Sequence, residues 1–174
     1  PGTLLEDLGR LPAPFREKGT VTAGNASGVN DGSAALIIAT EQAAKENGLQ
    51  CLARISAMAS AGVAPRIMGI GPVPASRKLM DHLDLRIDDF DVIEINEAFA
   101  AQVLAVIREF GLEDSAEHVN RNGGAISLGH PLGASGARLV GTAVRMLSEG
   151  GHKRALCTMC IGVGQGIAIA LDAA

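Results

Sequence analysis

The sequence predicts an α/β fold in which a mixed β-sheet lies between layers of helices. Short apolar runs alternate with longer segments of helical periodicity, in the order β-α-β-α-β-α-β-β, which is typical of layered α/β proteins. The composition agrees, because 174 residues with 47% hydrophobic and 20% charged residues suit a globular domain with a sizeable core. The 22 glycines, against a usual share of ~7%, indicate tight turns and close backbone approaches.

The first third of the chain predicts two strands and a short helix. Residues 1–19 are rich in turn residues and are interpreted as the tail of a loop excursion. The apolar run 34–40 follows a Gly/Asn/Ser-rich turn, and its length predicts a buried strand. Residues 41–47 form a polar helical stretch closed by Gly48, and residues 52–63 alternate apolar and small side chains as a strand does.

The middle of the chain predicts two amphipathic helices with a strand between them. Residues 72–83 predict a helix, since the prolines fall in its first turn and the large apolar residues share one face. The sequence D-V-I-E-I at 91–95 predicts a strand. Residues 97–110 predict a helix, because their large apolar side chains recur at three- and four-residue spacing.

The last part predicts a long helix and a pair of strands. A glycine-rich loop within 123–138 leads into a helix that ends near Gly150. The segments 154–160 and 166–172 predict two final strands joined by I-G-V-G-Q.

Composition excludes several classes of protein. A net charge of −4, the lack of a basic run and only four aromatic residues argue against nucleic-acid binding. The uncharged run 155–171 has glycines at its centre, which indicates a turn rather than a membrane span. Three cysteines and no signal-peptide pattern predict a reducing, cytoplasmic compartment. Pro1 is an unconvincing natural start, so we expect the chain to be a piece of something longer.

Three polar residues interrupt apolar, glycine-lined segments at predicted strand ends and helix starts, where α/β proteins place their sites: Asn96, His130 and Cys160. A histidine can act as a base, and a cysteine thiolate can move a proton to and from carbon. Each also has a structural interpretation. Asn96 could cap a helix, His130 could be a hydrogen-bonded structural histidine, and Cys160 could be a small buried apolar residue.

Three other motifs carry weaker signals. The C-T-M-C pair lies within a predicted strand, where Cys157 and Cys160 point to opposite faces, so a redox pair or a zinc site is disfavoured and no metal is expected. G-V-G-Q-G lacks the full dinucleotide-binding pattern and precedes a strand. G-H-P-L-G-A-S-G precedes a helix and could cradle a phosphate, but it lacks the lysine of a P-loop.

Five motifs, in order and spacing, resemble the thiolase family over essentially all 174 residues: T-A-G-N-A-S-G-V-N-D-G (22–32), M-G-I-G-P-V-P-A (68–75), N-E-A-F-A (96–100), G-G-A-I-S-L-G-H-P-L-G-A-S-G-A-R (123–138) and C-I-G-V-G-Q-G (160–166). The ending C-T-M-C-I-G-V-G-Q-G-I-A resembles the 3-oxoadipyl-CoA branch of that family. The resemblance implies the second of two βαβαβαββ halves, each with a mixed five-stranded sheet between helices, with residues 20–174 as the C-terminal domain.

The resemblance also implies roles for individual residues. Cys160 would be the acid/base that exchanges the proton at the thioester α-carbon. His130 would activate the nucleophile and, with a water held by Asn96, form one oxyanion hole, while the Gly162 amide would contribute to a second. These four residues are therefore expected to converge on one concave pocket.

Coenzyme A and its thioesters are the implied substrates, rather than a resident cofactor. Ser27 matches the position that contacts the pantetheine arm, and Ala23 and Val29 would line its tunnel. The family's nucleophilic cysteine lies in its first half in a C-x-S context, which Cys51 in C-L-A-R does not match. This chain alone is therefore expected to be inactive without the N-terminal half, and the full-length enzyme to be a homodimer or homotetramer.

The function that the resemblance implies is cleavage of a 3-oxoacyl-CoA, in particular 3-oxoadipyl-CoA, with coenzyme A to succinyl-CoA and acetyl-CoA. One alternative is a biosynthetic acetyl-CoA acetyltransferase. Another, of a different class, is a non-catalytic relative that binds acyl-CoA or lipid.

Overall fold

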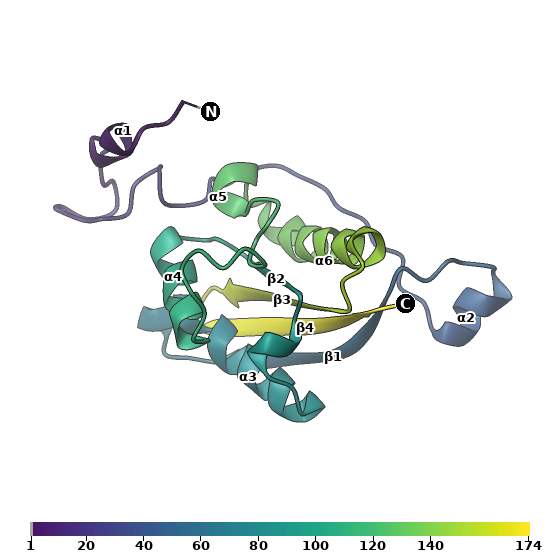
Figure 1. The fold of residues 1–174 in the computed structure, drawn as a ribbon. Coiled ribbons are helices and arrows are strands. Elements are labelled where there is room, and N and C mark those ends of the chain that lie inside the picture. The colour runs from purple at the N-terminus through teal and green to yellow at the C-terminus, as the bar shows by residue number, and fades with distance from the viewer. Residues whose placement is uncertain (1) are drawn as a thin grey trace.

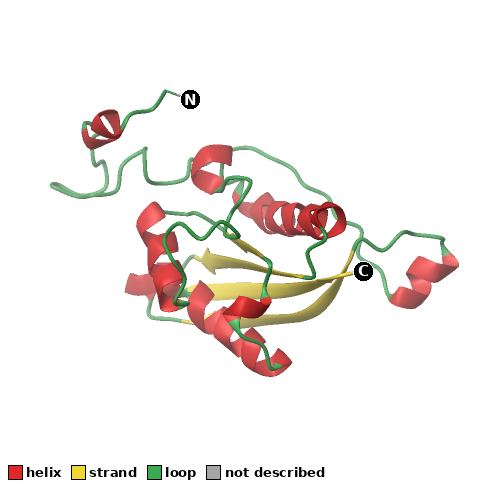
Figure 2. Ribbon diagram, in the orientation of Figure 1, coloured by secondary structure: helices red, strands yellow, loops and turns green. Residues whose placement is uncertain are grey.

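Four strands form one mixed sheet in the order β1-β4-β3-β2 in the computed structural model, which describes residues 2–174 (Figures 1 and 2). The strands are β1 (Ala53–Gly62), β2 (Val92–Ile95), β3 (Arg154–Ile161) and β4 (Gln165–Ala173). β2 and β3 run parallel, whereas β3–β4 and β4–β1 are antiparallel pairs. The parallel pair matters for function, because it brings the carboxyl ends of β2 and β3 to the same edge of the sheet.

Helices cover both faces of this sheet (Figure 1). The α-helices are α1 (Leu5–Gly9), α2 (Glu41–Glu46), α3 (Pro72–Leu83), α4 (Ala100–Glu109), α5 (Ala125–Leu128) and α6 (Leu132–Gly150), with 3₁₀ turns at Pro65–Ile70 and Ile87–Asp89. α3 and α4 bury their apolar faces in one core, against the strand residues Ile93, Ile95 and Leu156. α6 packs on the opposite face, against Val92 and Ala155. The sheet thus separates two cores, and the expected α/β class is confirmed.

Most sequence-predicted elements appear within a few residues of their expected limits. The helix over 72–83 has the predicted bounds, and four of the five predicted strands correspond to β1 to β4. The helix predicted over 97–110 begins three residues later, at Ala100. That delay leaves residues 96–99 as a loop after β2.

The strand predicted over 34–40 is wrong. The segment lies outside any helix or strand, and the side chains of Ile37 and Ile38 are 87% and 75% exposed. A strand needs a neighbouring strand for its backbone N–H and C=O groups, and no backbone hydrogen bond joins residues 34–39 to a strand within the described chain. The apolar run 34–40 has the composition of a strand, but within the described residues no strand lies beside it to pair with.

The predicted five-stranded sheet therefore has four strands here. At the β2 edge, the backbone N–H of Ile93 donates to His118 over 2.9 Å, and the N–H of Asn120 donates to Ile93 over 2.9 Å. These bonds make a single parallel bridge between Ile93 and Val119. A fifth segment thus lies beside β2 over one residue only.

One pair of glycines permits a close approach between the start of α3 and the start of β4. A Cβ added at Gly166 would overlap the carbonyl of Gly71, and one added at Gly71 would overlap the carbonyl of Gln165. Side chains at these two positions would push the helix away from the sheet. Part of the glycine excess therefore serves helix–sheet packing.

Only one stripe of α6 is buried within the described chain. Ser135, Leu139, Ala143 and Leu147 recur every four residues and face the sheet. The remaining residues of α6 are half-buried or exposed. The outer side of α6 is thus available to a further layer.

Candidate active site

Asn96 directly follows β2 and lies between the sheet and α6. Its backbone N–H donates to the carbonyl of Thr158 on β3 over 3.0 Å, which continues the parallel pairing beyond Ile95. Its side chain is fully buried, and its Nδ2 lies 3.3 Å from Nε2 of His130. Asn96 does not cap α4, because Phe99 occupies the N-cap position of that helix. The helix-cap interpretation is therefore wrong.

His130 precedes α6, and its ring lies between the Asn96 amide at Nε2 and the Ser135 hydroxyl at Nδ1. Nδ1 lies 2.6 Å from Oγ of Ser135, one of the fully buried residues of α6. The His130 backbone N–H donates to Oδ1 of Asn30 over 3.1 Å. Gly129 adopts a φ of +108°, a conformation that favours glycine, and this turn directs the chain into the helix. The imidazole is thus fixed from both sides.

The electrostatics of the site favour a neutral imidazole. Burial lowers the pKa of His130 below 6.5, and the nearby charge of Arg138 lowers it further. With Asn96 Nδ2 donating to Nε2, the ring proton lies on Nδ1 and is donated to Ser135. Neutral histidine is the form that can accept a proton.

Cys160 lies near the end of β3, opposite Gly166 of β4, and its side chain is buried. It follows Thr158, the partner of Asn96, by two residues, so Asn96 and Cys160 lie at the same edge of the sheet. No hydrogen bond joins Cys160 to Asn96 or His130 among residues 2–174. Burial raises the pKa of the Cys160 thiol, and a hydrogen bond with its own backbone opposes that rise. Cys160 is therefore a thiol rather than a thiolate in this arrangement.

The neighbouring cysteine belongs to the core. Cys157 packs among the α6-side residues, and burial strongly raises the pKa of its thiol. Positions three apart on a strand face opposite sides of the sheet. The two cysteines of C-T-M-C therefore do not form a pair, and both are free thiols.

The turn after β3 is exposed and tightly held. A Cβ at Gly162 would meet nothing within 4 Å, so its backbone faces open space. Val163 and Gly164 have φ values of +69° and +93°, and the backbone N–H of Val63 donates to the Gly164 carbonyl over 2.8 Å. Gly162, two residues beyond Cys160, is thus an exposed residue of this turn.

The segment expected to contact coenzyme A lies beside both site loops. Ser27 donates from its N–H and from its hydroxyl to the carbonyl of Ala98, over 3.1 and 3.3 Å. Isolated bridges join Ala26 to Phe99 and Val29 to His130. Val29 is exposed, and so is Ala23. The fold therefore brings the Ser27 segment next to the Asn96 and His130 loops.

Sequence reasoning missed several residues that support the site. Ser135 and Asn30 hold His130, as described above. Behind Asn96, Nδ2 of Asn120 donates to the Ile95 carbonyl and to Oε1 of Glu97, over 2.9 and 3.0 Å. The only usable signal was position, because Ser135 follows His130 by little more than one helical turn.

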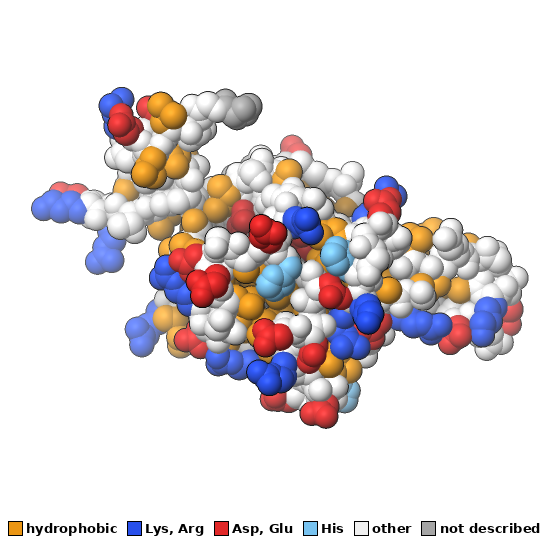
Figure 3. Space-filling view, viewed as in Figure 1, with side chains coloured by type: hydrophobic (Ala, Val, Ile, Leu, Met, Phe, Trp, Pro, Cys, Tyr) orange, Lys and Arg blue, Asp and Glu red, His pale blue; other side chains and the backbone are white. Residues whose placement is uncertain are grey.

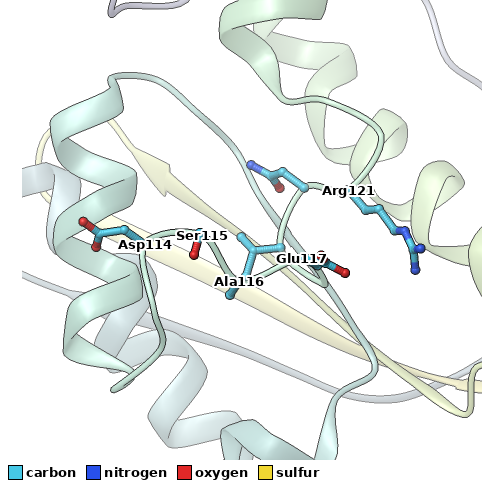
Figure 4. A pocket seen from close by; sticks show the side chains of 7 residues that line it. Asp114, Ser115, Ala116, Glu117 and Arg121 are labelled. Atoms are coloured by element: carbon cyan, nitrogen blue, oxygen red, sulfur yellow. The ribbon is translucent and has the colours of Figure 1, made fainter.

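A surface hollow lies apart from these residues. It encloses about 540 Å³ and is lined by residues 114–117 and 119–121 of the loop after α4 (Figure 4). None of the candidate residues lines it. On the face of the molecule shown in Figure 3, acidic and basic side chains are interspersed. Within residues 2–174 there is no group of His, Cys, Asp or Glu arranged to hold a metal ion, and no helix is long and apolar enough to cross a membrane.

Comparison with known proteins agrees with this fold. The family model for the C-terminal domain of thiolase matches residues 49–173, and the model for the N-terminal domain matches residues 1–42. An acetyl-CoA acetyltransferase of Bacillus anthracis has a TM-score of 0.92 and 49% identity, with 97% of this chain and 42% of that chain covered. Human mitochondrial 3-ketoacyl-CoA thiolase in complex with CoA has a TM-score of 0.90 and 44% identity, over 100% of this chain and 44% of that chain. The layered α/β domain thus has the thiolase fold.

The chain is also similar to individual thiolases of known name. The chain is 63% identical to a beta-ketoadipyl-CoA thiolase of Pseudomonas knackmussii over 172 residues, which cover 99% of this chain and 43% of that relative. It is 64% identical to a 3-oxoadipyl-CoA/3-oxo-5,6-dehydrosuberyl-CoA thiolase of Escherichia coli K12, with the same coverage. The chain belongs to the thiolase family. It spans less than half the length of these relatives.

Proposed function

We propose that the chain is the C-terminal part of an acyl-CoA C-acyltransferase that cleaves 3-oxoadipyl-CoA with coenzyme A to succinyl-CoA and acetyl-CoA. The observation that carries this proposal is the contact between Asn96 and His130 at the sheet edge where Cys160 also lies. The names of the two curated relatives support the substrate. A reducing cytoplasm suits an enzyme that depends on free thiols.

The first chemical step requires a nucleophilic thiol from outside this chain. Neutral His130 would accept its proton, and the thiolate would attack the C3 carbonyl of the 3-oxoacyl-CoA. A water held by Asn96, together with His130, and the Gly162 amide would each stabilise an oxyanion during the reaction. Two features of the described residues support these roles: a buried amide beside the imidazole, and an exposed glycine in the turn after β3.

The carbon–carbon bond then breaks between C2 and C3. The succinyl group stays on the nucleophile as a thioester, and the electron pair of the broken bond passes to the acetyl-CoA enolate. Cys160, held as a thiol by burial, would donate its proton to C2 of that enolate. The thiol of coenzyme A would then give its proton to the Cys160 thiolate and attack the succinyl thioester. The nucleophile would leave as a thiolate and take back the proton held by His130, which restores all three groups.

The N-terminal half is proposed to cover the outer side of α6. Residues 1–42 match the N-terminal thiolase model, and within them the strand-like segment 34–40 has exposed apolar side chains. The boundary after residue 19, with residues 20–174 as the C-terminal domain, belongs to the same proposal. Assembly as a homodimer or homotetramer belongs to the same proposal.

The test is turnover by the whole enzyme that contains this chain. Incubation with 3-oxoadipyl-CoA and coenzyme A should consume the 3-oxoacyl-CoA and yield succinyl-CoA and acetyl-CoA by mass spectrometry, and His130→Ala should abolish both products. A strong preference for acetoacetyl-CoA would favour the biosynthetic acetyltransferase, which the 49% identity to the Bacillus anthracis enzyme keeps as the second candidate. Binding of acyl-CoA without turnover would favour a non-catalytic relative.

A further inference from the structure

A buried pair of charged side chains lies behind the site. Glu94 of β2 is 0% exposed, and Arg138 of α6 has a side chain that is 19% exposed. Nη1 of Arg138 lies 3.9 Å from Oε2 of Glu94, which is at the limit for an ion pair. The pair therefore joins the two elements that carry the candidate site.

Neither side chain has a hydrogen-bond partner among residues 2–174. Both carboxylate oxygens of Glu94 and all three side-chain nitrogens of Arg138 are buried without one. Removing two charges from water costs more than their attraction returns unless hydrogen bonds complete the pair. Stability of the fold therefore gives no reason for this pair, and perturbed buried groups of this kind cluster at functional sites.

The position of the pair relates it to His130. Glu94 precedes Asn96 by two residues, so both side chains face α6. Arg138 follows Ser135 by three residues, which places both on one side of the helix. The pair thus lies directly behind the Asn96–His130–Ser135 contacts.

We propose that Arg138 is a positioning residue of the site, whose positive charge, only weakly countered by the buried Glu94 carboxyl, keeps His130 neutral and ready to accept a proton. The inference rests on the proposed function for its consequence in catalysis. A positive charge close to an imidazole disfavours the imidazolium form. A carboxyl group that is buried without hydrogen bonds favours its neutral, protonated form, and a neutral Glu94 leaves the charge of Arg138 in effect.

The charged and titratable groups around the pair agree with this assignment. Burial raises the pKa of Glu94 to about 7; Arg138 opposes that rise and Glu97 adds to it. Burial lowers the pKa of His130, with Arg138 as the second cause. Cys157, the β3 neighbour of Glu94, has a raised pKa and stays neutral. Below neutral pH, Glu94 and Cys157 are thus neutral, and neither cancels the charge of Arg138.

The test measures protonation of His130 directly in the whole enzyme. Diethyl pyrocarbonate modifies neutral imidazole, so its rate at the His130 peptide, followed by mass spectrometry against pH, gives the midpoint of that histidine. Arg138→Met should raise the midpoint by about 0.5 pH unit or more, because the positive neighbour is removed. Arg138→Gln is the second neutral variant, and Arg138→Lys should stay near the wild-type midpoint.

Glu94→Gln separates a protonated Glu94 from an ordinary ion pair. If Glu94 is protonated where His130 titrates, the glutamine, a neutral isostere, leaves the midpoint unchanged. A fall of about 0.5 pH unit would mean that an ionised Glu94 had been cancelling Arg138, and it would overturn the proposal. Unchanged midpoints in both neutral Arg138 variants would overturn it too.

Two controls guard against general effects. Arg145, paired with Glu149 over 2.6 Å on the exposed side of α6, allows Arg145→Met as a matched loss of charge, which should leave the midpoint unchanged. The exposed His82 in the same digests should titrate alike in every variant. Because modification needs no turnover, these results hold even if the whole enzyme fails to cleave 3-oxoadipyl-CoA. In an active enzyme, the acid limb of acyl-enzyme formation should move with the midpoint.

Discussion

Asn96 and His130, which are 34 residues apart in the sequence, meet side chain to side chain, with 3.3 Å between Nδ2 and Nε2. Asn96 directly follows the buried strand β2, and His130 precedes the long helix α6. The contact lies at the edge of the sheet where the carboxyl end of β3 carries Cys160. The chemistry proposed for the chain depends on this meeting.

Asn96→Ala should lower kcat of the whole enzyme by about 10²–10³-fold, the usual effect of removing one oxyanion-hole group. Asn96 is fully buried, and the smaller side chain takes away the amide without disturbing β2. Steady-state kinetics with 3-oxoadipyl-CoA measure the loss. An unchanged kcat together with a raised KM would assign Asn96 to substrate binding instead.

Ser135→Ala should slow acyl-enzyme formation by about tenfold, because the Nδ1–H of His130 loses its acceptor, 2.6 Å away. Ser148, on the exposed part of α6, provides the matched control, since its hydroxyl bonds only to a backbone carbonyl within the helix. Rapid-quench mass spectrometry of the acylated protein gives the rate. Equal rates for the two alanine variants would show that Ser135 has no role in holding the imidazole.

Cys160→Ser should leave acylation of the nucleophile by succinyl-CoA intact but reduce carbon–carbon cleavage of 3-oxoadipyl-CoA, followed as thiolysis, by about 10²–10⁴-fold, because a hydroxyl is a far weaker acid and base at carbon than a thiol. Cys157→Ser is the companion variant. Its site lies in the α6-side core, away from the open edge, so it should affect stability more than turnover. Equal losses of thiolysis in both variants would instead favour the redox-pair interpretation.

The pKa of His130, lowered by burial and then by Arg138, predicts how stability depends on pH. The unfolded histidine binds a proton near pH 6.5, whereas the folded one binds it only at lower pH. The free energy of unfolding should therefore fall as pH decreases below about 6.5, and level off once the folded histidine is also protonated. Urea unfolding of the wild type and of His130→Gln at several pH values isolates the contribution of His130 to the free energy of unfolding. If the free energy of unfolding of His130→Gln fell more steeply with decreasing pH than that of the wild type, the predicted direction would be wrong.

The chain by itself should self-associate. Ile37 and Ile38 are exposed, as are Leu128 and Leu132 beside the open side of α6, so an apolar surface faces water. Light scattering of the 174-residue chain should show dimers or larger species. Replacing Ile37 and Ile38 with serine should reduce them. A monodisperse monomer of the unaltered chain would refute this prediction.

Local patterns in the sequence determined most of the secondary structure. The prolines and the apolar face of residues 72–83 specify α3, and the alternation within 52–63 specifies β1, because helix and strand periods are properties of the chain itself. The motifs around Asn96, His130 and Cys160 identify the candidate residues by local pattern alone. What these residues have in common is a position at the end of an element, and that too is a local property.

Only the tertiary structure decided which side chains meet. Residues 34–40 have the composition of a strand, yet strand formation depends on a neighbouring strand, and none lies beside them in the described chain. In the sequence Ser135 is one small residue of a predicted helix, whereas in the fold its hydroxyl contacts His130. In the sequence Glu94 is one residue of a predicted strand, whereas in the fold the packing of α6 buries it beside Arg138. Contacts between distant segments, and the burial that shifts a pKa, arise from packing in three dimensions, which no local period encodes.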